Sequence, residues 1–138
     1  MAQTLYLSPR KHIYELQQEF AAFYPYLRLD LFHHQYSDVA ARPVKIIARS
    51  SLLAAAGLKG EGTMDISDTM TIAELESAMK ERFGLLVQVI RQSGTIWLET
   101  TMTDDWTLKQ QNDHGRELSK HIVADRSEDF DLGRGNLS

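Results

Sequence analysis

Two pairs of adjacent polar residues are the parts of this sequence that could do chemistry: His33-His34 and Asp104-Asp105. Imidazoles are common metal ligands, and paired carboxylates can act in acid–base catalysis or hold a cation. Neighbouring residues of a strand point to opposite faces, however, so the two histidines could bind one metal ion only across a bend. The aspartates directly precede residues 106–108, where they fit the negatively charged first turn of a helix. We therefore expect no metal site and no cofactor.

Other chemical signals are weaker still. Thr100, Thr101 and Thr103 are candidate nucleophiles, but no histidine stands at a recognisable spacing from them. The glycine-rich segment 57–62 lacks the Gly-Lys-Ser/Thr of a phosphate-binding loop and leads into a predicted strand instead of a helix. The chain has no cysteine, which excludes disulfides, thiolate metal sites and cysteine nucleophiles. No set of residues combines a nucleophile, a base and an orienting group, so we predict no catalytic residues.

Composition limits the classes of partner. The 138 residues are 43% apolar and 25% charged, which is typical of one globular domain or of two small units that share a core. The net charge of −4 and the scattered basic residues argue against nucleic-acid binding. No run approaches the roughly 18 apolar residues of a membrane span, and the N-terminal segment lacks the apolar core of a signal peptide. We expect a cytoplasmic protein with neither nucleic acid nor membrane as a partner.

The sequence contains an internal repeat. Segments 12–25 and 71–84 match at a shift of 59 positions, which carries Ile13 to Ile72. The apolar residues of both segments recur at the spacing of an amphipathic helix: Ile13, Leu16, Phe20 and Phe23 in the first, and Ile72, Leu75, Met79 and Phe83 in the second.

The predicted helices have recognisable ends. Thr71 and Glu74 form a capping box at the start of the second helix, and Ser8-Pro9 offers a start for the first. Pro25 and Gly84 are expected to end the two helices at matching places.

Strands and shorter helices repeat in the same order. We predict strands at 4–8 and 63–67 before the helices, strand 26–34 with a partner at 44–48, and a hairpin over 85–100. Short helices are predicted at 50–58 and at 107–115, the latter with a weaker capping box at Thr107 and Gln110. The sequence thus predicts two β-α-β-β-α units, at residues 1–60 and 61–115. Residues 116–138 would form a C-terminal extension, partly helical and then flexible.

The second unit resembles the ubiquitin-like β-grasp arrangement. Its helix opens with Thr-Ile-x-x-Leu, ends at a glycine and is followed by a hairpin and then by DDWTLKQQN. The resemblance covers residues 63–113 well and 4–58 more loosely, and it implies an α+β fold with the helices on one face of a mixed or antiparallel sheet. The tail GRGNLS is not a terminal diglycine, so a covalent tag or sulfur carrier is not implied. Segment 84–108 is also similar to parts of small bacterial proteins that bring no activity with them.

The predicted hairpin offers a candidate binding surface. A two-residue loop at Ser93-Gly94 would place Ile90 opposite Trp97 on the sheet face away from the helices. The helix-facing side would then carry Val87, Val89, Ile96 and Leu98. Together with Phe32, on the polar side of strand 26–34, Ile90 and Trp97 form the predicted binding surface, because exposed apolar patches usually mark interaction sites. The alternative is that the tail, a loop or the other unit covers this pair.

Two functions from different classes remain open at this point. The first is a non-catalytic module that binds a protein partner or a second copy of itself through the open sheet face. The second is a small enzyme or ligand-binding protein with a pocket between the units, lined by His33, Arg91, Asp104 and Trp106. A flat exposed patch favours the first, whereas an enclosed pocket with strongly perturbed acids or histidines favours the second.

Overall fold

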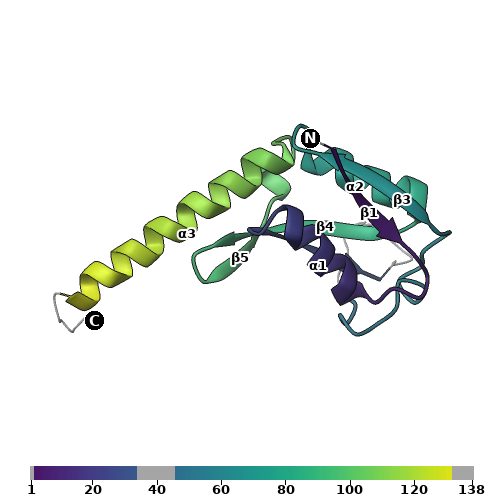
Figure 1. Cartoon of the computed structure of the whole chain (residues 1–138), viewed down its shortest axis with the longest axis horizontal. Coiled ribbons are helices and arrows are strands. Elements are labelled where there is room, and N and C mark those ends of the chain that lie inside the picture. The colour runs from purple at the N-terminus through teal and green to yellow at the C-terminus, as the bar shows by residue number, and fades with distance from the viewer. Residues whose placement is uncertain (1, 34–45, 132–138) are drawn as a thin grey trace.

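The computed structural model describes residues 2–33 and 46–131, and the side chains of 3–33 and 46–120. In this part of the chain the fold is α+β, with three α-helices and two antiparallel sheets, as predicted at the level of fold class (Figure 1). The long helix α3 (Leu108–Asp131) projects away from a body that contains the other elements.

Each sheet combines strands from both halves of the chain. Strand β1 (Ala2–Leu7) pairs with β3 (Gly62–Ser67), and β2 (Leu27–Phe32) pairs with β4 (Leu86–Ser93), which also pairs with β5 (Ile96–Glu99). All of these pairings are antiparallel, so neither sheet is mixed. Strands on either side of one helix therefore lie in different sheets, and neither half encloses a core of its own.

Helices α1 (Ile13–Phe23) and α2 (Ile72–Phe83) match the predicted segments. The capping box of α2 is present, because the Glu74 N–H donates to Thr71 Oγ1 (3.1 Å) and the Thr71 N–H donates to Glu74 Oε1 (2.9 Å). Gly84 ends α2 in the left-handed conformation, with φ of 70°. The predicted start of α1 at Ser8-Pro9 is wrong: His12 is its N-cap residue, and the His12 N–H donates to Glu15 Oε1 (2.8 Å).

The apolar faces of both helices meet in one core. Leu16 and Leu75 have no exposed surface, and they lie in the same buried cluster as the inward-facing residues of both sheets. The members from the two sheets are Leu5, Leu7, Met64 and Ile66 on one side, and Leu27, Leu29, Leu31, Val87 and Val89 on the other. Because units of about 60 residues bury so little surface that their stability alone is marginal, a shared core is the expected arrangement for this chain.

The chain returns to the start of each helix in the same way. Segment 49–54 bonds to the residues around the start of α1, and segment 104–109 does so at α2. The matching backbone bonds are Ile13 N–H to Ser51 O and Ile72 N–H to Trp106 O, then Leu53 N–H to Lys11 O and Leu108 N–H to Met70 O. In the smaller sheet Leu5 pairs with Met64, its counterpart at the shift of 59, so equivalent strands face each other antiparallel.

One predicted element of the first half is not formed, and another is described only in part. Residues 50–58 make successive turns instead of a helix, with the Gly57 N–H bonded to Ala54 O and Gly57 at φ of 97°. These turns follow the bridge between His12 and Leu52, which ties the segment to the start of α1. Of the predicted strand 44–48, residues 44 and 45 lie outside the described residues, and Ile46 makes an isolated bridge to Phe32.

Helix α3 runs without a break through Gly115 and into the predicted, partly helical extension. It begins with the expected capping box, because the Gln110 N–H donates to Thr107 Oγ1 (3.1 Å) and the Thr107 N–H donates to Gln110 Oε1 (2.8 Å). It then continues past Gly115, where the second unit was predicted to end, and through the proposed start of the extension at 116. Gly115 is instead a contact point: a Cβ there would lie 2.9 Å from Tyr26 Cβ and 3.0 Å from Gln92 O.

Candidate functional site

The loop of the β4–β5 hairpin lies one residue later in the chain than predicted, and the pairing of the two strands changes with it. Ser93 pairs with Ile96, so Gly94 and Thr95 form the loop, and Gly94 has the positive φ (67°) that such a loop requires. Trp97 is opposite Gln92, and Ile90 is opposite Glu99. The predicted Ile90–Trp97 pair is therefore wrong. Glycine is more easily placed at the first loop position than serine, which explains the shift.

Ile90 and Trp97 nevertheless lie on the predicted face of the hairpin. Both residues lie on the sheet face opposite the main core, where they are diagonal neighbours across the two strands. Phe32, two residues beyond Asp30 on β2, lies on the same face. Ile90 and Phe32 are buried outside the main core cluster, and Trp97 is 37% exposed. Only Trp97 of these three is thus open to a partner.

The prediction that Ile96 and Leu98 join the helix-facing core is wrong. Ile96 is 56% exposed and Leu98 is 38% exposed, although both lie on the core side of the sheet. Helix α1 packs on β2 and helix α2 on β4, whereas the hairpin extends past the ends of both helices (Figure 1). Every residue of β5 is consequently exposed, and Met102, just beyond it, is 94% exposed.

Trp97 is held in place by an arginine. The Arg28 guanidinium lies 4.7 Å from the centre of the Trp97 ring, in a cation–π contact. Arg28 also binds Asp30 with two hydrogen bonds, from Nε to Oδ1 (2.9 Å) and from Nη2 to Oδ2 (3.2 Å). Asp30 is buried, so the carboxylate restricts the guanidinium and the guanidinium in turn supports the ring.

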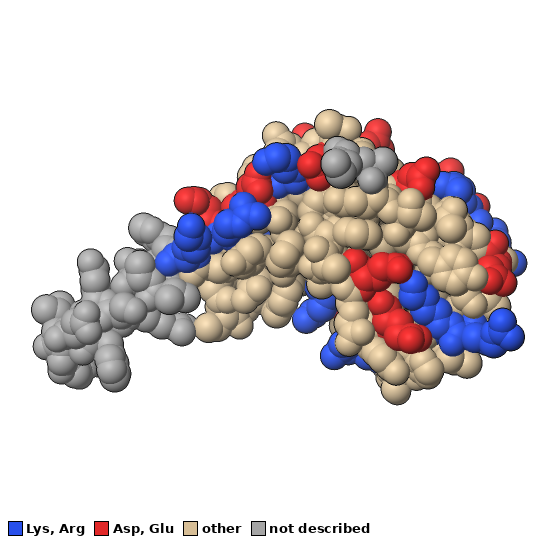
Figure 2. All heavy atoms as spheres, in the orientation of Figure 1, with Lys and Arg blue, Asp and Glu red and all other residues tan. Residues whose placement is uncertain are grey.

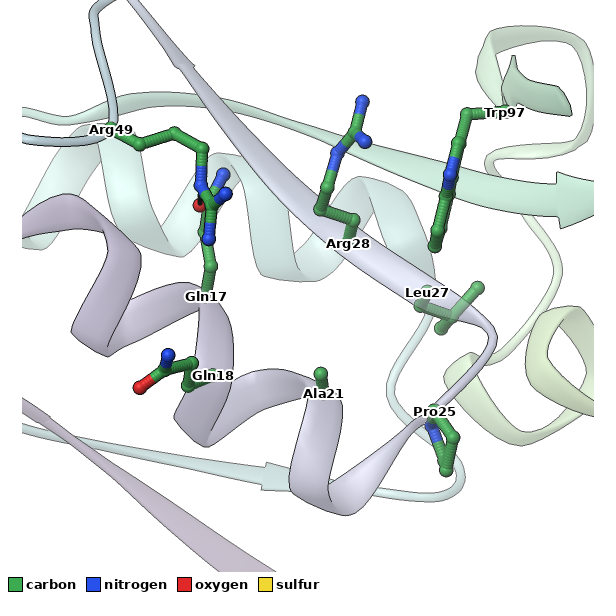
Figure 3. Close-up of a pocket in the computed structure, with 8 residues that line it drawn as sticks. All are labelled: Gln17, Gln18, Ala21, Pro25, Leu27, Arg28, Arg49 and Trp97. Carbon is green, nitrogen blue, oxygen red and sulfur yellow. Dashed lines mark hydrogen bonds between the residues drawn. The ribbon is translucent and has the colours of Figure 1, made fainter.

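A depression of about 270 Å³ lies beside this pair, between α1 and the adjacent edge of β2 (Figure 3). One wall carries Trp97 and Arg28, and the other carries side chains of α1. Arg49 stands at its end, where its Nε donates to Gln17 Oε1 (2.6 Å). The complete lining is Gln17, Gln18, Ala21, Pro25, Leu27, Arg28, Arg49 and Trp97.

The two edges of the larger sheet differ in how their outward-pointing backbone groups are hydrogen-bonded. On β2, Leu29 O accepts a hydrogen bond from Gln17 Nε2 (2.7 Å), and Leu31 O accepts one from the Ile47 N–H (2.8 Å). These bonds cover the outward-pointing carbonyls of Leu29 and Leu31. At the other edge, β5 is the last strand of the sheet in the described part of the chain. Its backbone therefore presents an open row of donors and acceptors.

The direction of these open groups follows from the hydrogen bonds of β4. The Gln92 N–H donates to Tyr26 O (2.9 Å), which places the backbone groups of Gln92 on the β2 side. Because Gln92 is opposite Trp97, that pair is not hydrogen-bonded, and the N–H and C=O of Trp97 point to the outer edge. Glu99, two residues on, points the same way.

The ladder between β4 and β5 stops at Thr100. Thr100 Oγ1 donates to Val89 O (2.8 Å), while the Val89 N–H donates to Glu76 Oε2 (3.0 Å). Both bonds replace the backbone pairing that a longer hairpin would make. Burial raises the pKa of the Glu76 carboxyl, an effect opposed by its bond from Val89 and supported by the nearby charge of Asp104.

The four residues of the alternative pocket do not converge. His33 is exposed just past Phe32, whereas Arg91 pairs with Leu27 at the opposite end of β2. His33 is six positions from Leu27 along the chain, which corresponds to about 20 Å along a strand. Asp104 lies at the start of α2, where its carbonyl accepts the Ala73 N–H.

Trp106 packs edge-on against His114, with 5.3 Å between the ring centres, and neither contacts His33. Of the residues predicted for a site, only Trp97 lines the depression that the structure contains.

Two buried glutamines have structural roles that the sequence did not reveal. Gln111 accepts a hydrogen bond from Arg91 Nη1 (2.9 Å) and donates to Thr103 Oγ1 (2.6 Å), which ties α3 to the hairpin. Burial lowers the pKa of Arg91. Gln17 bridges Arg49 and the edge of β2. The only sequence signal for either is a polar residue on an otherwise apolar helix face, which does not identify its partner.

Charge is evenly mixed on the visible face of the molecule. Figure 2 shows basic and acidic side chains interspersed over the body, while the region occupied by the hairpin in Figure 1 is uncharged. Within the described residues, no three His, Asp or Glu side chains gather in a way that could hold a metal ion. None of the helices, in the part of the chain that the structure describes, is long and apolar enough to cross a membrane.

Comparisons with protein-family models, with curated proteins and with solved structures found no match to this chain.

Proposed function

We propose that this protein is a non-catalytic interaction module that binds a protein through the outer strand of its β4–β5 hairpin. One observation carries the proposal: every residue of β5 is exposed, including Ile96, Trp97 and Leu98. Three consecutive large apolar residues on an open sheet edge are unfavourable in a free monomer, because they leave apolar surface in water and invite edge-to-edge pairing.

The binding mode that fits this surface is strand addition. Trp97 and Glu99 point backbone donors and acceptors outward, so an extended segment of a partner can extend the sheet by hydrogen bonding. Trp97 on one face and Ile96 and Leu98 on the other then provide apolar contacts on both sides of the added strand. The contact between Trp97 and Arg28 supports the tryptophan in advance, which lowers the entropy lost on binding.

The proposal includes an architecture of tandem copies. We propose that residues 2–32 and 62–93 are duplicates of one β-α-β unit, supported by the shift of 59 and by the matching backbone bonds at the starts of α1 and α2. The ubiquitin-like resemblance of residues 63–113 stays a prediction.

A cytoplasmic location is also part of the proposal and is supported by the lack of cysteine.

A second candidate function is ligand binding in the depression beside Trp97. Its lining places the guanidinium groups of Arg28 and Arg49 with an aromatic wall, a combination that suits a small anionic or planar ligand. Asp30 already neutralises Arg28, however, so the depression offers less positive charge than its two arginines indicate. The exposed hairpin is therefore the better supported site.

Photo-crosslinking in the native cells tests the interaction surface directly. A photoreactive amino acid would replace Ile96 in the full chain, and a matched control would carry it at Ser77, an exposed residue of α2. The proposal predicts one or a few discrete crosslinked products from position 96 and none from position 77. Equal products from both positions, or none from either, would contradict it.

A second measurement separates binding from folding. Leu98→Lys adds a charge to the exposed side of β5, and Ser77→Lys adds the same charge on α2. Unfolding midpoints of both variants are expected to stay within about 0.5 kcal/mol of the parent protein, as for most surface changes. Only Leu98→Lys is expected to abolish the crosslink from position 96.

A further inference from the structure

The open edge of β5 also indicates which partner fits it. We propose that two copies of this chain form a two-fold symmetric dimer, in which β5 of one copy pairs antiparallel with β5 of the other and the two larger sheets become one. This inference rests on the proposed interaction function and names its partner.

The first argument is the way this chain already builds its sheets. In β1–β3, Leu5 pairs with Met64, and these two residues correspond at the shift of 59. In β2–β4, Leu29 pairs with Val89 and Asp30 pairs with Gln88. At the shift of 59, Leu29 corresponds to Gln88 and Asp30 to Val89, so each of these residues pairs with the neighbour of its counterpart. Both sheets therefore join equivalent strands antiparallel about a local two-fold axis. Pairing β5 with its own copy continues the larger sheet by the same type of contact.

The second argument concerns the register. If Leu98 lies on the two-fold axis, Trp97 is opposite Glu99 of the second copy, and the outward N–H and C=O groups of both residues are used in both copies. The two Leu98 side chains then form a non-hydrogen-bonded pair, the closer type of cross-strand neighbour. Centring the pairing on Glu99 would place two like charges opposite each other, which is destabilising.

The third argument is the position of α3. The last described side-chain contact between α3 and the hairpin is the bond from the Gly94 N–H to Ser119 Oγ (3.1 Å), yet the helix continues to Asp131. The remaining residues span about 18 Å at the rise of an α-helix. Figure 1 shows this part projecting past the hairpin, at the same end of the molecule as β5. A copy docked on β5 would lie beside this part of the helix.

Disulfide crosslinking of the full chain tests the dimer and its register together. Because the sequence has no cysteine, a single introduced cysteine can form a disulfide only between two copies. Leu98→Cys places the two sulfurs at a close cross-strand pair, where disulfide geometry is accessible. Ile96→Cys is the matched control on the same strand and face: in this register the two cysteines lie four residues apart along the strands, or about 13 Å.

We expect sedimentation of the unmodified protein to show a dimer that dissociates on dilution. Mild oxidation should convert Leu98→Cys to a covalent dimer at least about tenfold faster than Ile96→Cys, because only the former meets the distance limit of a disulfide. Leu98→Lys should weaken association by about tenfold or more, since two like charges would meet at the axis, while Ser77→Lys should leave it unchanged.

A monomer at every concentration would overturn the dimer. Equal crosslinking of Leu98→Cys and Ile96→Cys, or a faster reaction of Trp97→Cys, would overturn the proposed pairing centred on Leu98. A monomeric protein whose position 96 crosslinks to a different protein in cells would refute the second copy and leave the interaction surface standing. A monomer without any crosslink at position 96 would refute both.

Discussion

Replacing Gly115 by alanine tests how α3 is attached to the body of the protein. A Cβ at this position would lie 2.9 Å from Tyr26 Cβ, 3.0 Å from Gln92 O and 3.1 Å from Arg91 Cγ. The first two of these atoms belong to segments that are joined to each other, because the Gln92 N–H donates to Tyr26 O (2.9 Å). Neither segment can move away without disturbing the other.

Two effects of opposite sign determine the result. Alanine is more favourable than glycine inside a helix by about 1 kcal/mol, which would stabilise the variant. Forcing an extra methyl group into a packed contact costs about 1–3 kcal/mol. Since the contacts involve backbone and Cβ atoms that cannot rotate away, we expect the steric term to be larger. Gly115→Ala should therefore reduce the free energy of unfolding by about 1–2 kcal/mol.

Urea denaturation followed by tryptophan fluorescence and circular dichroism measures this change. Gly60→Ala is the matched control, because a Cβ at Gly60 has no atom within 4 Å, and its effect should stay within about 0.5 kcal/mol. Hydrogen exchange would show whether the loss is confined to α3. If Gly115→Ala stabilises the protein by the helix-propensity term alone, α3 does not contact the hairpin as described.

Three further predictions concern the core, a helix cap and a partly buried acid. Leu16→Ala and Leu75→Ala should each lower the free energy of unfolding by about 2–5 kcal/mol in chemical denaturation, because both residues are fully buried; losses under about 1 kcal/mol at both would show that they are not in the core. Thr71→Ala should cost about 1 kcal/mol by removing the cap of α2, whereas Thr71→Ser should cost less. Glu76 has a pKa raised chiefly by burial, so its contribution to stability should fall as pH rises from the ordinary glutamate pKa through the folded value. Glu76→Gln should then be more stable than the parent protein at neutral pH, with the difference vanishing in acid; a difference independent of pH would contradict the assignment.

Local signals in the sequence were sufficient for α1 and α2 and for the strands next to them. The capping box at Thr71 and Glu74 and the glycine at 84 act within a few residues of chain, so they can be read without knowing the fold. The apolar periodicity around Leu16 and Leu75 likewise indicated the core, because one buried face is sufficient to produce it. The α+β class followed from these elements.

Predictions that needed a distant partner were less successful. The sequence predicted the end of the second unit at Gly115, whereas the small size of this residue serves the contact with Tyr26, which is far away in sequence. The predicted hairpin loop was one residue too early in the chain. Ser93-Gly94 and Gly94-Thr95 are both acceptable loops, and only the pairing of Ser93 with Ile96 distinguishes them. The pocket predicted around His33 and Arg91 assumed that the two ends of the sheet meet.

Helices α1 and α2, the apolar face that each buries, and the hairpin face that carries Ile90 and Trp97 could be predicted from the sequence, because caps and hydrophobic periods are properties of a short stretch of chain. Three other features depend on the whole fold: strands of the two halves share both sheets, Gln17 covers the edge of β2, and Ile96 and Leu98 stay exposed. Exposure at β5 depends on where the helices end relative to the hairpin. That relation is set by the packing of the whole core and leaves no mark on the residues of β5 themselves.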